Sequence, residues 1–320
     1  MGVRKAAPMT STLRLTTAIA LCTLAIVGSA SFASAADPSK VGATTYSRSF
    51  EFYQDIEKGM KEAGGDKVVF DFRDPNGDLA AQTAQIEDFV SKKVDLVTIV
   101  PIDSTAAEAE GRLVTGAHIP LITVDIAITK DVGQVAHIAS DNHQGGEIAA
   151  KKMADLLSGK GEVLVINNPA IVSVVDREKG FAAKLAEIAP GIKIVASQSG
   201  ESKREKAQAV AEDLLQAHPN AVGIFAVNDE MALGALQAVI AAGRQGKISI
   251  IGFDASSEGL KEIAKGDSAF KASVAQDPVQ IGKIVTQTAL SVLKGDKVDK
   301  LIPVPVVLVD KSNYTNYLKK

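Results

Sequence analysis

Polar side chains able to bind a small molecule stand where apolar segments of the chain end. Asn228 follows the apolar run 222–227, and Asp254 follows the apolar run 248–253. Between the two runs, apolar residues recur at helical spacing up to Gly243. This order of strand, helix and strand predicts a βαβ unit with parallel strands. Ligands of open parallel sheets bind beyond the carboxyl ends of the strands, so we expect Asn228 and Asp254 to line a site.

The same arrangement occurs earlier in the chain, over residues 95–127. An apolar strand leads to a polar turn at Asp103, an Ala-rich helix ends near Gly116, and the next strand ends at Asp125. Asp125 therefore corresponds to Asp254. Two sheets that each place a carboxylate at a strand end predict two similar α/β lobes, and we interpret the cleft between them as the binding site.

The rest of the chain continues this alternation. Apolar runs predict strands at 41–45, 68–72, 135–138, 162–166, 192–197 and 270–275, with helices at 79–90, 142–157, 174–188, 203–218 and 278–293. Gly145 and Gly146, at the start of one helix, are expected to let it pack closely. Regular βα alternation is typical of α/β proteins with doubly wound parallel sheets.

The first 35 residues differ in composition from the remainder. Three cations, Arg4, Lys5 and Arg14, precede the apolar run 15–27, and Ala33-Ser34-Ala35 offers small residues for cleavage. This pattern predicts a secretory signal peptide at residues 1–35. A membrane anchor is the alternative, but the apolar run is shorter than the roughly 20 residues that span a bilayer.

Composition limits the classes of partner. The chain has 320 residues, of which 46% are hydrophobic and 23% charged, enough for one large or two medium domains. Loss of residues 1–35 removes three cations and no acid, so the formal charge changes from −3 to −6. An acidic chain without a basic run predicts no nucleic-acid partner. The single cysteine, Cys22, leaves with the signal peptide, so the mature chain has no disulfide.

Motifs for catalysis or metal binding are missing from the sequence. The four histidines show no paired spacing around a glutamate, and no Gly-x-Ser-x-Gly or strand-following Gly-x-Gly-x-x-Gly occurs. We expect no enzyme activity, no metal and no cofactor. One catalytic alternative stays open, in which Asp125 and Asp254 hydrolyse a glycoside across the cleft. Their matching positions in a repeat favour binding over catalysis.

Four segments carry a resemblance to a known family, and they occur in that family's order. They are Ala226-Val-Asn-Asp-Glu-Met-Ala-Leu-Gly-Ala235, Ile251-Gly-Phe-Asp254, Ile138-Ala-Ser-Asp-Asn142 and Val274-Ala-Gln276. Together they resemble the ribose-type periplasmic sugar-binding proteins of bacterial ABC importers, over nearly the whole mature chain. Repressors with the same fold carry an N-terminal DNA-binding helix pair, where this chain has an export signal.

The resemblance implies two lobes joined by three crossings, near Ser140, Gln276 and Pro305, that close around the ligand. The N-terminal lobe comprises residues 36–139 and 277–305, and the C-terminal lobe comprises residues 140–276 and 306–320. It also implies a monomeric periplasmic protein that binds a small neutral sugar or polyol and delivers it to an ABC permease in the inner membrane. A non-sugar small solute is the other ligand class that we retain.

Binding residues follow from the resemblance, position by position. They fall on the aromatic pair Phe52 and Tyr53, at the opening of a first helix for which Ser49 is the candidate cap, and on Asp125, Arg177, Asn228, Asp254 and Gln276. Carboxylates accept from sugar hydroxyls, Arg and Asn side chains donate, and aromatic rings cover the apolar face of a sugar. Consecutive helical residues point in different directions, so one of the two rings could instead lie in the core. Tyr46 and Phe50 are further candidates for a stacking ring.

Other residues of the family pattern have a different expected role or have changed. Asp141 and Asp229 stand at helix entries, where they are expected to act as caps rather than ligands. Ribose binders have Arg directly after the first-lobe aspartate, whereas this chain has Ile126, and Ser202 stands where they have a Phe. We therefore expect a ligand other than ribose, such as another pentose, a tetritol or a pentitol.

Overall fold

A computed structural model describes Gly2 and residues 37–318. Residues 37–318 form two α/β lobes. The first lobe is built on a six-stranded sheet whose paired strands are all parallel, in the order β11-β5-β4-β3-β1-β2. Its strands are β1 (Ser39–Thr44), β2 (Val68–Arg73), β3 (Leu96–Ile99), β4 (Leu121–Val124), β5 (Ala136–Ser140) and β11 (Leu301–Val304). The helices packed with it are α1 (Glu51–Gly64), α2 (Leu79–Ser91), α3 (Ala107–Gly116) and α9 (Pro278–Leu293).

The second lobe repeats this plan with a sheet in the order β12-β10-β9-β8-β6-β7. Its strands are β6 (Lys160–Asn167), β7 (Gly191–Ser199), β8 (Ala221–Ala226), β9 (Ser249–Asp254), β10 (Phe270–Ala275) and β12 (Val307–Asp310). Its helices are α4 (Asn142–Leu156), α5 (Val172–Ile188), α6 (Arg204–Ala217), α7 (Asp229–Ala241) and α8 (Ser257–Lys265). The expected doubly wound α/β class is confirmed, although β12 runs antiparallel to β10 at the edge of the sheet.

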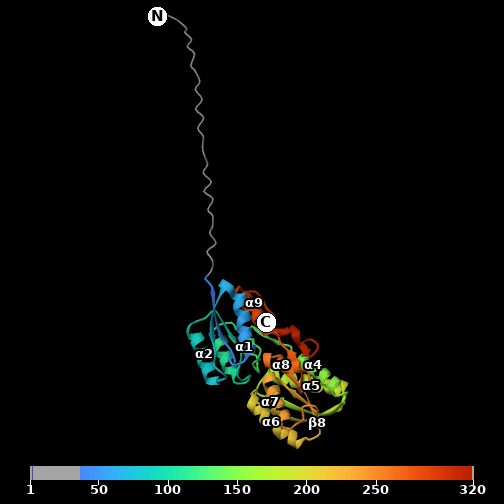
Figure 1. Cartoon of the computed structure of the whole chain (residues 1–320). Helices are drawn as coiled ribbons and strands as arrows, with labels where there is room; N and C mark the ends of the chain where they lie inside the picture. The colour runs from blue at the N-terminus through green and yellow to red at the C-terminus, as the bar shows by residue number, and fades with distance from the viewer. Residues whose placement is uncertain (1, 3–36, 319–320) are drawn as a thin grey trace. The chain divides into compact units, whose positions relative to one another are not determined.

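The chain passes between the two sheets three times. It leaves the first sheet after β5, returns to it after β10, and changes sheet again between β11 and β12. As a result, the late helix α9 lies next to the early helix α1 (Figure 1). The residue-level lobe boundaries given above stay a prediction.

Glycines set the spacing of the helix pairs that carry site residues. A Cβ atom on Gly146 of α4 would lie 2.0 Å from the carbonyl oxygen of Arg177 in α5, and one on Gly180 would lie 2.1 Å from that of His143. No side chain fits at such distances, so the α4–α5 crossing requires glycine on both helices. The expected close packing at Gly146 is confirmed. Gly59 and Gly282 make the equivalent crossing between α1 and α9.

The hydrophobic core lies on both faces of the sheets. Strands β8 and β9 are almost fully buried, as continuous apolar parallel strands should be. Phe181 of α5 stacks on Phe225 of β8, with ring centroids 4.3 Å apart. Among the described residues, no helix is long and apolar enough to cross a membrane. The expected signal peptide lies outside the described residues.

Candidate functional site

One cavity, of about 60 Å³, lies at the carboxyl ends of the strands and takes its lining from both lobes. All seven residues expected to bind ligand line it, together with Tyr46, Phe50, Ile126, Ile171, Ser173, Val174 and Ser202. The structure therefore brings together expected ligand-binding residues that are as much as 224 positions apart in the chain, Phe52 and Gln276. Their role in binding is a proposal that we develop below.

Arg177 is held in one orientation by the second lobe. It is 4% exposed, so it does not belong to a solvated charge run. Its Nε donates to Oδ1 of Asn142 and its Nη1 to the carbonyl oxygen of Val227, both at 2.7 Å. The guanidinium carbon lies 3.8 Å from the centroid of the Phe253 ring, and Nη1 lies 3.6 Å from Oδ1 of Asp254. A cation fixed in this way can donate to a ligand with little loss of rotamer freedom.

Asp254 stands on a strained turn at the end of β9. Its φ is 110° and that of Ala255 is 49°, values that non-glycine residues seldom adopt. Nε2 of Gln276, from the end of β10, donates to Oδ1 of Asp254 at 2.6 Å. Burial raises the pKa of Asp254 to about 6, and the nearby Arg177 charge opposes the rise. The turn thus presents a partly desolvated carboxylate to the cavity.

The structure corrects which residue caps the start of α7. Asn228, rather than Asp229, is the N-cap, because its Oδ1 accepts from the backbone N of Met231 at 2.8 Å. This bond directs the amide nitrogen of Asn228 away from the helix end. Asp229 is the first helical residue and is 1% exposed. Asp141, by contrast, caps α4 as expected.

Asp229 lies behind the Asp254 turn and supports it. Its Oδ2 accepts from the backbone N of Ser256 and its Oδ1 from Oγ of Ser273, each at 2.7 Å. Burial, followed by the charge of Asp254, raises the pKa of Asp229 to about 8. The expectation that Asp229 caps its own helix was wrong because the nearby backbone donor that it binds belongs to a different segment.

Asp125 is the carboxylate that the first lobe contributes. Oη of Tyr53 donates to its Oδ2 at 3.1 Å, while its Oδ1 is buried and has no partner among the described residues. Burial raises the pKa of Asp125. Burial, with the Asp125 charge as the next cause, raises the pKa of the Tyr53 phenol well above its usual value, so the phenol remains a donor.

Four aromatic rings form one cluster beside Asp125. Tyr46 stacks on Tyr53 with centroids 5.7 Å apart, and Phe50 and Phe52 meet Tyr53 edge-on at 6.1 and 5.2 Å. Both rings of the Phe52–Tyr53 pair line the cavity, so neither lies only in the core. The cluster gives the cavity an apolar surface of the kind that covers the carbon face of a sugar.

Two acceptor atoms in the cavity lack hydrogen-bond donors within the described part of the chain. They are Oδ1 of Asp125, in the first-lobe carboxylate, and Oε1 of Gln276, whose amide nitrogen is bound to Asp254. A buried acceptor without a partner costs about 1–3 kcal/mol. A ligand that supplies hydroxyl donors at these two positions removes that penalty.

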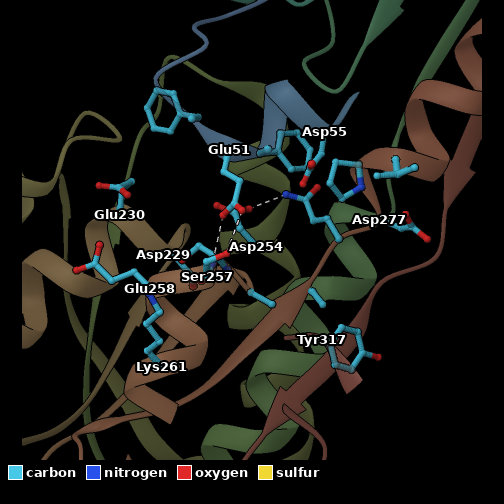
Figure 2. A pocket seen from close by; sticks show the side chains of 18 of the residues that line it. Glu51, Asp55, Asp229, Glu230, Asp254, Ser257, Glu258, Lys261, Asp277 and Tyr317 are labelled. Atoms are coloured by element: carbon cyan, nitrogen blue, oxygen red, sulfur yellow. Dashed lines mark hydrogen bonds between the residues drawn. The ribbon is translucent and has the colours of Figure 1, made fainter. Parts of the chain in front are cut away.

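A second and larger cavity, of about 560 Å³, adjoins the first and shares Phe50, Phe52, Asp254 and Gln276 with it. Figure 2 shows that acidic side chains surround it, with Glu230, Glu258 and Lys261 along one side. Its acids are engaged in part: Arg204 binds both Glu230 and Glu258.

Hydrogen bonds join the lobes at two places, between Glu51 and Ser257 and between Ser104 and the start of α5. In Figure 2 Glu51 of α1 reaches Ser257, the first residue of α8, whose Oγ donates to it at 3.0 Å. Ser104, after β3, accepts at its Oγ from the backbone N of Val172, the first residue of α5, at 3.2 Å. The N-cap residue of α5 makes no side-chain bond of its own, so the first lobe supplies that cap. Sequence analysis missed these residues because no local pattern marks a contact between distant segments.

A model of the periplasmic binding protein domain matches residues 41–297. The chain belongs to the periplasmic binding protein family. The ribose import binding protein RbsB of Bacillus subtilis (strain 168) is 35% identical to this periplasmic binding protein over 254 residues, which cover 79% of this chain and 80% of the relative. RbsB of Haemophilus influenzae is 38% identical over 258 residues, covering 80% and 84%.

Solved structures of this family agree with the fold of our periplasmic binding protein. An ABC transporter solute-binding protein from Bacillus halodurans, solved with bound myo-inositol, matches with a TM-score of 0.80 at 26% identity, over 88% of this chain and 98% of that one. The family consists of solute-binding proteins rather than enzymes, and it includes a ribose import binding protein and an ABC transporter solute-binding protein. Within the described residues, no group of His, Cys, Asp or Glu side chains could hold a metal ion.

Proposed function

We propose that this protein captures a small sugar or sugar alcohol between its lobes in the periplasm and delivers it to an ABC import permease. The observation that carries the proposal is the pairing of unpartnered buried acceptors with an aromatic cluster in one cavity. Hydroxyl groups satisfy the acceptors, and the carbon face of a sugar or polyol covers the rings. The names of the relatives, which include a ribose import protein and a myo-inositol complex, support the same ligand class.

The proposed ligand-binding residues are the seven that line the cavity from both lobes: Phe52, Tyr53, Asp125, Arg177, Asn228, Asp254 and Gln276. Only a closed arrangement lets one small molecule reach Asp125 and Asp254 together. Ligand binding therefore stabilises the closed form, by about 2.7 kcal/mol when the ligand is at one hundred times its Kd. The protein acts as a monomer and needs no cofactor.

Thermal-shift screening of the purified mature protein tests this proposal. The panel contains pentoses, hexoses, tetritols, pentitols, inositols and amino acids, each at millimolar concentration. We expect a rise in Tm with one or more sugars or polyols and none with amino acids. A rise in Tm with amino acids alone would contradict the proposed sugar or polyol ligand, and it would leave the fold assignment unchanged.

The alternative enzyme function requires turnover by Asp125 and Asp254. The raised pKa of Asp254, about 6, is compatible with a general acid, but both carboxylates occupy equivalent strand ends, as binding groups do. Calorimetry combined with product analysis distinguishes the two functions. Stoichiometric heat and an unaltered sugar after prolonged incubation support binding, whereas steady release of a cleaved sugar establishes hydrolysis.

Delivery to a permease is tested in the cell. We expect uptake of the identified ligand to fall when the gene of this protein, or that of its permease, is deleted. Unchanged uptake in the permease deletion would contradict the transport role and leave the binding role intact.

A further inference from the structure

The two sides of the small cavity differ in chemistry. The first lobe contributes what we call the aromatic wall, which consists of Tyr46, Phe50, Phe52, Tyr53 and Ile126. The second lobe and its junction contribute what we call the polar wall, which consists of Ser173, Arg177, Ser202, Asn228, Asp254 and Gln276. Two apolar residues at the start of α5, Ile171 and Val174, also line the cavity from this side. Asp125 is the one charged side chain that stands on the side of the aromatic wall.

The aromatic wall has little hydrogen-bonding capacity left for a ligand. The Tyr53 hydroxyl already donates to Asp125 at 3.1 Å. The remaining polar atoms on this side are the unpartnered Oδ1 of Asp125 and the hydroxyl of half-buried Tyr46. A ligand can therefore place one or two hydroxyls on this side, and further hydroxyls would face carbon atoms.

Ile126 adds to this deficit at the position next to Asp125. Its side chain lines the cavity and is 3% exposed, so it cannot turn out to make room for water. An arginine at this position, as in ribose binders, would offer up to five N–H donors beside the carboxylate. Isoleucine offers none and adds apolar surface.

The polar wall, by contrast, keeps several hydrogen-bond donors and acceptors available for one side of the ligand. Asn228 has its oxygen bound to the α7 backbone, so its amide nitrogen can donate. Gln276 has its nitrogen bound to Asp254, so its buried Oε1 can accept. With Asp254 and the fixed Arg177, these groups recognise a row of hydroxyls along one edge of a small molecule.

From this asymmetry, and on the basis of the function proposed above, we propose that the ligand is a polyol with an unsubstituted apolar side. A deoxy or C-methyl sugar has this form, with its hydroxyls on the polar wall and its bare carbon against the aromatic wall and Ile126. The aromatic wall then acts as a specificity element, because each hydroxyl placed against it loses water without gaining a partner.

Isothermal titration calorimetry with matched sugar pairs tests the inference. Each pair differs by one oxygen: D-galactose with 6-deoxy-D-galactose, L-mannose with 6-deoxy-L-mannose, and D-ribose with 5-deoxy-D-ribose. An apolar pocket rejects an added hydroxyl by at most about 100-fold. We therefore expect the deoxy member of the best-binding pair to bind about 10-fold to 100-fold more tightly. Equal or tighter binding of the fully hydroxylated member in every pair that binds overturns the inference and leaves the proposed function standing.

Two variants of one residue assign the selectivity to the aromatic wall. Ile126→Arg restores donors beside Asp125 and is expected to reduce the preference for the deoxy sugar by about 10-fold or more, or to reverse it. Ile126→Val keeps an apolar side chain and should keep the preference. Where Ile126→Arg does not fold, judged by circular dichroism and Tm, Phe50→Tyr introduces a hydroxyl on the same wall and should shift the preference in the same direction. An unchanged preference in a folded variant contradicts the role of the wall.

Discussion

Oδ2 of Asp229 accepts a 2.7 Å hydrogen bond from the backbone N of Ser256, two residues beyond Asp254. Oδ1 of Asp229 binds Oγ of Ser273, which in turn accepts from the backbone N of Ala255 at 2.9 Å. These bonds hold the strained turn that carries Asp254. Gly252 and Gly259 leave room for the carboxylate, since a Cβ at either position would lie 2.2 or 2.6 Å from its oxygens.

Removal of the Ser273 hydroxyl should weaken ligand binding without removing any ligand contact. Ser273→Ala leaves the Ala255 N–H and one Asp229 oxygen without a partner, which costs about 1–3 kcal/mol and releases the turn. We expect Kd to rise about fivefold or more in calorimetry. Ser268→Ala is the matched control, because Ser268 also accepts from a backbone N–H beside β10 but has no contact with the turn. Equal effects of the two substitutions would mean that the turn does not depend on Ser273.

Asp254→Ala should reduce affinity because it leaves ligand hydroxyls, Arg177 and Gln276 without their shared acceptor. The loss of a charge-assisted bond costs about 1.5–3 kcal/mol, equivalent to a roughly tenfold to hundredfold rise in Kd. Asp78→Ala serves as the control, since Asp78 caps α2 and does not itself line the cavity, so its removal should lower Tm with little effect on affinity. Undiminished affinity of Asp254→Ala would exclude Asp254 from the site.

Gly146→Ala should disturb Arg177 through the packing of two helices. The added Cβ would meet the Arg177 carbonyl oxygen at 2.0 Å, so α5 must move and carry the guanidinium with it. We expect a lower Tm and a Kd that rises about tenfold. At Gly116, the last residue of α3, an added Cβ meets nothing within 4 Å, so Gly116→Ala should leave both quantities nearly unchanged. Native affinity in Gly146→Ala would show that α5 tolerates the shift.

Ser104→Ala should affect closure of the lobes. In the closed form the Ser104 hydroxyl caps α5 across the cleft, and a cap of this type contributes about 0.5–2 kcal/mol. Water can satisfy the same N–H when the lobes are apart, so the effect belongs to the closed form alone. We expect Kd to rise about twofold to tenfold, while the Tm of the ligand-free protein changes little. Small-angle X-ray scattering with and without ligand measures the degree of closure directly.

The pH dependence of stability should follow the carboxylate pair Asp229 and Asp254. Their folded-state pKa values, about 8 and about 6, lie above the usual value of 3.8 for Asp. Each of these groups therefore holds more protons in the native protein than in the unfolded chain at any pH between 3.8 and its folded-state pKa. The free energy of unfolding should increase as the pH falls from 8.5 to 6.5. Below pH 6.5 buried His137, with its pKa lowered to about 4, opposes the trend.

Thermal melts of the ligand-free protein measure this slope. Asp229→Asn removes the group that titrates near pH 8 and should flatten the rise in Tm between pH 8.5 and 6.5. Ligand affinity should move in the opposite direction at lower pH, because protonation of Asp254 near pH 6 removes a charged acceptor for ligand hydroxyls. A Tm that rises equally in Asp229→Asn would assign the dependence to other groups.

Local sequence was sufficient to predict the α/β class and most of the elements. Continuous apolar runs such as residues 222–227 become strands buried on both faces, and such a run can be recognised without knowledge of distant residues. The ends of the strands also place Asp125 and Asp254 at matching positions, and the family resemblance adds Arg177 and Gln276. The elements β11, β12 and α8 were not predicted. Strands β11 and β12 lie at the edges of their sheets, where Pro303 and the exposed Leu301 and Val307 hide the pattern of a buried strand.

Tertiary structure decided which of these residues face one another and what each one does. Asp229 and Asn228 are neighbours with similar helix-capping propensity, and only the nearby Ser256 and Ser273 place Asp229 in a buried supporting role. Ser104 has no local signal at all, since the N–H that it binds is 68 residues away. Sequence patterns record local propensity and burial, whereas hydrogen-bond partners and the contrast between the two cavity walls depend on how separate elements pack. The sequence therefore determined the lobes and most candidate residues, and the packing of the lobes determined the chemistry that a ligand meets.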